Sequence, residues 1–206
     1  MIIALKQFFR FLLSALVIIL YAGAIIAFAQ SGKTTQSMPT QQSTPSPSPS
    51  PATSSPAANP ADVNSIEAIL EAVYDVISGP AGKKRDWDRM RSLFIPGARL
   101  IPIGPRQAGG YGSRVLSVED YVTRGNEIFA KEGFFEKEVV RRVETFGNIA
   151  HVFSTYEARH SPDDAKPFVR GINSIQLMND GKRWWIVTIF WQAEDENNPL
   201  PEKYLK

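Results

Sequence analysis

Three stretches between residues 64 and 129 carry apolar residues at helical spacing. The clearest stretch starts at a capping box formed by Asn64 and Glu67, and Gly79-Pro80 stops it. Its apolar positions fall on one face of a helix, at Ile66, Ile69, Leu70, Val73 and Ile77. We therefore predict a helix that ends before Gly79 and buries this face.

Two more helices are predicted from their capping residues. Asp86 begins a short one that Pro96-Gly97 ends, and Ser117 with Asp120 forms the capping box of the other. Between these two helices, residues 99–103 have the composition of a strand.

From Glu136 onward the spacing of apolar residues is that of β-strands. We predict two hairpins of long strands: residues 136–146 with 149–159, and residues 168–178 with 183–192. The turns fall at Gly147-Asn148 and at Asp180-Gly181. A two-residue turn at the second position places Asn173 opposite Thr188.

Helices with one early strand thus precede a run of long antiparallel strands. This order predicts an α+β domain over residues 63–206, with three helices packed against one face of a curved antiparallel sheet. A chain segment of this length is a common size for one domain.

The domain resembles the nuclear transport factor 2-like superfamily, which includes ketosteroid isomerase and SnoaL-like proteins. The resemblance covers roughly residues 63 to 195 and rests on the element order and on three local patterns. These are Ile66-Glu-Ala-Ile-Leu-Glu-Ala-Val-Tyr74, Trp87-x-x-Met-x-x-Leu-Phe94 and the stretch from Ile172 to Trp185. It implies a cystatin-like cone, in which a bent sheet surrounds the helices and leaves an internal pocket.

The resemblance also implies where an isomerase would keep its catalytic groups. Tyr74 stands about where that enzyme has its oxyanion-hole tyrosine, and Asn173 stands in place of its protonated aspartate. The catalytic aspartate would fall near Pro102, where no carboxylate is available. Removing a proton beside a carbonyl needs a base within hydrogen-bond reach, so the isomerase mechanism lacks its central residue.

The predicted pocket takes the residues that share a face with Asn173 or point from the helices toward it: Tyr74, Trp87, Tyr121, Asn173, Trp184, Thr188 and Phe190. Tyr74 and His151 are weak catalytic candidates, with Glu144 opposite His151 across the first hairpin. The alternative for Tyr74 and Asn173 is a purely structural role, and cross-strand charged pairs such as Glu144 and His151 are ordinary in sheets.

The opposite face of the last strand is apolar as well, with Trp185, Val187, Ile189 and Trp191. A sheet face exposed to solvent normally alternates to polar residues, and a large apolar strip usually marks an interface. We therefore expect a homodimer that forms through these four residues.

Composition removes several classes of function. The chain has no cysteine and only two histidines, which excludes thiol chemistry and makes a multi-histidine metal site improbable. After residue 61 it carries 20 basic and 21 acidic residues, so no basic surface is expected for nucleic acid. We expect no cofactor and no metal.

The first 62 residues have the composition of a targeting segment and a linker. Lys6 and Arg10 precede an uncharged apolar run over residues 11–29, which indicates a signal peptide or a retained membrane anchor at residues 1–29. Residues 30–62 are rich in Ser, Thr and Pro and are predicted to be a disordered linker. Both alternatives place the domain outside the cytoplasm (periplasmic or secreted), with membrane contact only through this segment.

Three functions remain open after these exclusions. The first is a domain that binds a small apolar or amphipathic molecule without assigned reaction. The second is an enzyme that uses Tyr74 and Asn173 as hydrogen-bond donors, and the third is a scaffold whose cone is filled with side chains. An open cavity of at least about 300 Å³ lined by Tyr74 and Asn173 would favour the first two, and a filled cone would favour the scaffold. A carboxylate or histidine inside it near Asn173 would favour the enzyme.

Overall fold

The computed structural model describes residues 55–206. The predicted signal peptide or anchor (residues 1–29) and residues 30–54 of the predicted linker lie outside the described residues. Residues 55–62, which we assigned to the linker, are described, and α2 (Pro60–Val63) begins there behind its N-cap Asn59. No helix within residues 55–206 has both the length and the apolar character needed to cross a membrane.

The three predicted helices are present as α3 (Ile66–Ile77), α4 (Trp87–Leu93) and α5 (Val118–Phe129). Asp86 caps α4, and the predicted Ser117–Asp120 capping box starts α5. The N-cap of α3 is Ser65 rather than Asn64, because the Ser65 hydroxyl accepts the Ala68 N–H at 3.0 Å.

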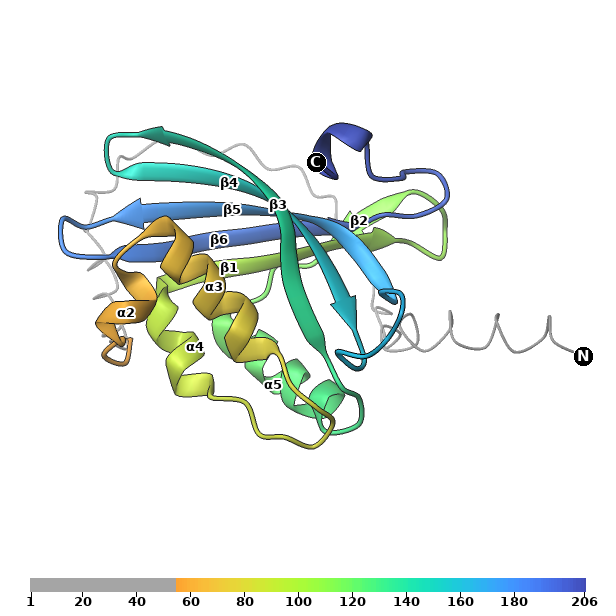
Figure 1. Cartoon of the computed structure of the whole chain (residues 1–206), viewed down its shortest axis with the longest axis horizontal. Helices are drawn as coiled ribbons and strands as arrows, with labels where there is room; N and C mark the ends of the chain where they lie inside the picture. The colour runs from red at the N-terminus through yellow and green to blue at the C-terminus, as the bar shows by residue number, and fades with distance from the viewer. Residues whose placement is uncertain (1–54) are drawn as a thin grey trace, which may run out of the picture. The chain divides into compact units, whose positions relative to one another are not determined.

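The six strands form one sheet in the order β2-β1-β6-β5-β4-β3. Their bounds are β1 (Phe94–Pro105), β2 (Tyr111–Ser113), β3 (Phe135–Phe146), β4 (Ile149–Arg159), β5 (Val169–Asn179) and β6 (Trp184–Ala193). All neighbouring pairs are antiparallel except β1 with β6, which is parallel. Figure 1 shows the helices on one side of this curved sheet, with β3 bending past α3. The predicted α+β class is confirmed.

The core lies between the helices and the concave face of the sheet. From the helices it takes residues such as Ile69, Leu70 and Met90, each at most 1% exposed. From the sheet it takes alternate residues, such as Val152 on β4 and Ile175 directly opposite on β5. Residues paired in this way point to the same side, so the register decides which side chains reach the interior.

The first hairpin has the predicted register near its turn, with Glu144 opposite His151, but a bulge at Val139 shifts the pairing by one residue, so that Glu136 is opposite Ala158. The second does not, because its loop contains four residues, from Asp180 to Arg183, rather than two. The Asp180 carboxylate accepts the backbone N–H groups of Lys182 and Arg183 at 2.9 Å each, which stabilises the longer loop. The longer loop moves the pairing by two residues, and together with a bulge at Val187 it places Asn173 opposite Trp191 and not opposite Thr188.

A register shift between Gln176 and Leu177 exchanges the inward and outward residues of β6 after Val187. Leu177 pairs with Ile186 and Gln176 with Thr188, so Val187 is the extra residue on β6. Ile186 and Ile189 therefore both face the core, at 0% and 8% exposure.

These shifts correct the predicted faces of β6. Ile189 and Trp191, predicted on the outer face, belong to or pack against the core. Thr188 and Phe190, predicted inside, lie on the outer face, where Phe190 is 43% exposed. Of the predicted interface residues, Trp185 keeps its outer position opposite Met178.

Candidate functional site

Three buried polar side chains meet inside the cone. The Tyr74 hydroxyl lies 2.7 Å from Ser154 Oγ, and Asn173 Nδ2 donates to the Tyr74 hydroxyl at 3.0 Å. Their exposed fractions are 7% for Tyr74, 0% for Ser154 and 7% for Asn173. The predicted association of Tyr74 with Asn173 is therefore present, with Ser154 as a third member.

The fold places these residues by simple periodicity. Tyr74 lies in the last turns of α3, on the face that also buries Leu70 and Ile77. Ser154 on β4 is paired directly with Asn173 on β5, so both side chains point to the concave side.

Two carboxylates from β3 join this cluster. Ser154 Oγ donates to Glu138 Oε2 at 2.5 Å, and Asn173 Nδ2 donates to Glu136 Oε1 at 3.1 Å. Arg141 neutralises Glu138, with its Nε 2.5 Å from Oε1. No lysine or arginine within residues 55–206 forms an ion pair with Glu136, which is therefore an interior carboxylate stabilised by an amide alone.

The end of α3 fixes the backbone of Glu136. Ser78 Oγ accepts the Glu136 N–H at 3.0 Å and lies 3.2 Å from its carbonyl oxygen. Ser78 Oγ also donates to the Tyr74 carbonyl oxygen at 2.7 Å. One serine therefore ties the turn that carries Tyr74 to the strand that carries Glu136.

Burial changes the protonation of the cluster. It raises the pKa of Glu136 to about 7, and the hydrogen bond from Asn173 opposes this rise. Burial, followed by the charge of Glu136, also raises the pKa of Tyr74, which therefore stays a neutral phenol at physiological pH. Near pH 7 both the protonated and the ionised form of Glu136 are populated, as proton transfer requires.

Two further tyrosines face the same interior. Burial and then the charge of Glu136 raise the pKa values of Tyr121 and Tyr156, and for Tyr121 the nearby Arg85 opposes this rise. Neither hydroxyl has a hydrogen-bond partner within residues 55–206, yet neither is a fully enclosed unpaired atom. Tyr121 and Glu136 are both only half-buried. The side chains of Glu136, Tyr121 and Tyr156 therefore keep unused hydrogen-bonding capacity.

The remaining predicted pocket residues lie apart from this cluster. Trp87 donates from Nε1 to Asn126 Oδ1 at 2.6 Å and stacks on Phe129, with ring centroids 6.1 Å apart. Trp184 packs against the core at the β5–β6 hairpin. Thr188 and Phe190 are on the outer face, so only Tyr121 joins Tyr74 and Asn173.

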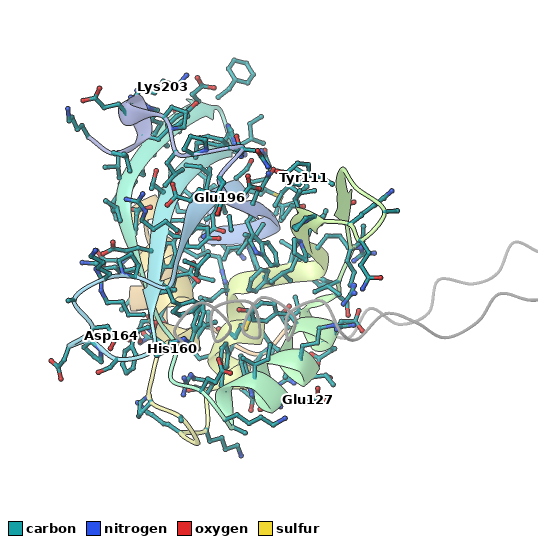
Figure 2. All side chains as sticks on the ribbon, turned by 90° about the vertical axis from the view of Figure 1, so that its right-hand side faces the viewer. Tyr111, Glu127, His160, Asp164, Glu196 and Lys203 are labelled. Carbon is teal, nitrogen blue, oxygen red and sulfur yellow. The ribbon has the colours of Figure 1, made fainter. Side chains whose placement is uncertain are left out.

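Neither histidine belongs to the cluster. His151 lies on the outer face, with Nε2 2.9 Å from Ser174 Oγ. His160 lies beside Asp164 at the edge of the molecule, where Figure 2 labels both. In the described part of the chain, no three His, Asp or Glu side chains stand in a metal-binding arrangement.

Two hollows open on the surface near α4 and α5. One of about 540 Å³ is lined by Lys84, Arg85, Asp86, Trp87, Asp88 and Arg91. The other, of about 200 Å³, lies between the segment around Arg85 and the end of α5. Tyr74, Asn173 and Glu136 line neither hollow, so neither is the cavity around Asn173 that would favour binding or catalysis.

The carboxylates and Ser154 were not predicted from the sequence. The resemblance places the base near Pro102, which pairs with Trp191 on the inward side and carries no acidic group. The acidic group comes instead from β3, on the other side of Asn173. Two glutamates separated by one residue, Glu136 and Glu138, were the available signal, but alternating glutamates usually mark a solvated strand face.

Comparison with known proteins gives similarity only to solved structures. No protein-family model matches the chain, and no curated protein matches it. A protein of unknown function with a cystatin-like fold from Nostoc punctiforme is 9% identical, with a TM-score of 0.48 over 64% of this chain and 90% of that one. A nuclear transport factor 2-like protein of unknown function from Pseudomonas putida is 11% identical, with a TM-score of 0.48 over 66% and 90%.

A third similar structure, a nuclear transport factor 2-like protein from Silicibacter pomeroyi, is 15% identical, with a TM-score of 0.43 over 64% of this chain and 94% of that one. Its function is also unknown. All three are described as cystatin-like or nuclear transport factor 2-like, and the likeness concerns the fold alone.

Proposed function

We propose that the domain binds a small, largely apolar molecule inside the cone and transfers a proton to or from it through Glu136. The observation that carries this proposal is an interior carboxylate with a pKa of about 7, bonded to Asn173 and without a cation partner among the described residues. Such a group exchanges protons near neutral pH, whereas a carboxylate kept only for structure is normally paired.

The surrounding groups support the same role. Tyr121 and Tyr156 are neutral phenols with unused hydroxyls, so both are available to donate to an oxygen of the bound molecule. Trp191 and Ile189 supply apolar walls on the neighbouring strand. A carboxylate beside Asn173 supports an enzyme over a domain that only binds, although Asn173 lines neither of the two surface hollows.

The location of the chain is proposed on the sequence alone. Residues 1–29 support an extracytoplasmic domain, cleaved free or tethered to the membrane. The exposed apolar side chains on the outer face of the sheet support a homodimer, with Trp185 retained from the predicted interface and Phe190 added to it.

Base-catalysed opening of 5-nitrobenzisoxazole tests the proposed chemistry, because it needs only a carboxylate base in an apolar site. Glu136 takes the ring C–H proton, the C–H electron pair completes a nitrile, and the N–O bond breaks to give a coloured phenolate. We expect a rate that rises with pH through an apparent pKa near 7 and is lost in Glu136→Gln. Glu127→Gln, which changes an exposed carboxylate on α5, is the matched control and should keep the rate.

Carboxyl carbon chemical shifts, followed by NMR against pH, give an independent readout. Glu136 should titrate near pH 7 in the folded protein. A titration at the ordinary glutamate pKa would overturn the proposal. A titration near pH 7 with equal rates for wild type and Glu136→Gln would leave a binding domain without proton transfer.

A further inference from the structure

The side chains between Glu138 and Glu136 form one continuous hydrogen-bonded chain. It runs from Glu138 through Ser154, Tyr74 and Asn173 to Glu136, with contacts of 2.5, 2.7, 3.0 and 3.1 Å. We propose that Glu138 fixes the direction of this chain, and that Ser154 and Tyr74 are positioning residues that hold the Asn173 amide against Glu136. The inference rests on the proposed role of Glu136 in proton transfer.

The direction starts at the ion pair between Glu138 and Arg141. An ionised carboxylate only accepts hydrogen bonds, and Arg141 Nε at 2.5 Å stabilises that ionised form. Ser154 must therefore use its single proton to donate to Glu138. With that proton engaged, the serine oxygen is left as an acceptor for Tyr74.

The same logic carries the direction to Glu136. The Tyr74 hydroxyl donates its one proton to Ser154, so toward Asn173 it only accepts. Asn173 must then present its amino group and not its carbonyl oxygen to Tyr74. One amide proton goes to Tyr74 and the other to Glu136. Because Glu138 accepts at one end of the chain, the Asn173 amide donates to Glu136 at the other end.

This direction changes the role expected for Tyr74. In the isomerase resemblance Tyr74 donates to the bound molecule, but here its proton is engaged with Ser154 inside the protein. The hydroxyls that remain for a bound molecule are those of Tyr121 and Tyr156. Tyr74 acts through Asn173 on Glu136 instead.

Ser154→Ala breaks the chain without changing any charge. The buried Tyr74 hydroxyl then lacks an acceptor, and the neighbouring group that supplies one is Asn173, if its amide turns to present oxygen. Glu136 would lose the N–H that stabilises its ionised form. We expect its NMR titration midpoint to rise by about one pH unit. The pH–rate profile with 5-nitrobenzisoxazole should move by the same amount.

Two further variants make the result decisive. Ser174→Ala removes a serine hydroxyl on the outer face of β5, where it contacts His151, and should leave the Glu136 midpoint unchanged. Tyr74→Phe breaks the chain one step closer to Asn173 and should also raise the midpoint, which covers a failure of Ser154→Ala to fold.

The inference is wrong if Glu136 has the wild-type titration midpoint in both folded variants, Ser154→Ala and Tyr74→Phe. A merely structural role of these residues would lower stability and leave the midpoint unchanged. An ordinary midpoint for Glu136 in the wild type would instead contradict the proposed function. The two failures are therefore distinguishable.

Discussion

Glu136 contributes unfavourably to folding in its ionised form, because an interior carboxylate loses hydration and here gains a single amide donor in return. Its neighbour Glu138, two residues along the same strand, has Arg141 and Ser154 as partners. The contrast between the two supports the proposed role of Glu136 in proton transfer, since an unpaired interior carboxylate is otherwise unfavourable.

The first prediction concerns the pH dependence of stability. Below the pKa that Glu136 has in the unfolded chain, the neutral carboxyl makes its full contribution to the free energy of unfolding. This contribution is lost as pH rises through the pKa of about 7 in the folded protein. The difference from the usual value of 4.5 corresponds to about 3 kcal/mol. Glu136→Gln should therefore gain up to about that much relative to wild type between pH 4 and pH 9, measured by urea unfolding. Glu127→Gln should show no such trend.

A second prediction concerns the hydroxyl of Tyr74. Tyr74→Phe leaves Ser154 and Asn173 buried without a shared partner, and should reduce the free energy of unfolding by about 1–3 kcal/mol. Tyr111→Phe removes an exposed hydroxyl bonded to Asp195 at 2.6 Å and should change stability by less than about 0.5 kcal/mol. Equal effects in denaturant titrations would show that burial does not strengthen the Tyr74 contacts.

At the scale of elements, the sequence predicted the helix caps and the turn that are stabilised by residues close together in the chain. The caps at Asp86 and Ser117 were predicted correctly from side chains that bond the backbone N–H three residues on, and the turn at Gly147-Asn148 from a glycine that adopts a positive φ of 54°. The predicted register of the second hairpin was wrong because Asp180 stabilises a four-residue loop, whereas Asp180-Gly181 predicted a two-residue turn. A bulge at Val187 then reversed the faces of β6, and no local pattern marks it.

The candidate site was predicted only in part, for the same reason. Tyr74, Tyr121 and Asn173 were found because their positions follow helix periodicity or the family resemblance. Glu136 was not, because β3 contains a register shift between Glu138 and Val140. The run of valines after it suggests an apolar inner face, yet Val139 is 44% exposed and the glutamates point inward.

The third prediction tests the close approach of the central strands. A Cβ added at Gly171 would lie 2.3 Å from Gln192 O and 2.7 Å from the Tyr156 hydroxyl. Gly171→Ala should therefore destabilise the domain by about 1–3 kcal/mol and displace Tyr156 from the site. Gly104→Ala, in β1 with no atom within 4 Å of the added carbon, is the matched control. Equal unfolding midpoints would contradict this packing.

At the scale of the molecule, the two faces of the sheet have different partners. The helices cover the concave face, and the C-terminal segment covers part of the outer one. There the Tyr204 ring lies tilted against Phe153, with centroids 5.1 Å apart, and the Tyr204 carbonyl oxygen accepts a hydrogen bond from the Thr155 hydroxyl at 2.6 Å. Figure 2 shows this segment, at Lys203, far from Glu127 on α5. Beyond it the outer face keeps apolar side chains, among them Phe190 and Ile149 at 43% and 57% exposure.

The last prediction concerns this uncovered part of the outer face. Phe190 stands beside Ile101 of β1, and its side chain projects away from the core. If two copies associate through this face, a charge at residue 190 would be buried without a partner, so Phe190→Glu should weaken the dimer by more than about tenfold. Sedimentation equilibrium measures the change. Ile128→Glu, at an apolar residue 51% exposed on α5, should leave association unchanged because the helices lie on the other side of the sheet. A monomeric wild type would remove the basis for the proposed homodimer, and equal weakening by both variants would place the contact elsewhere.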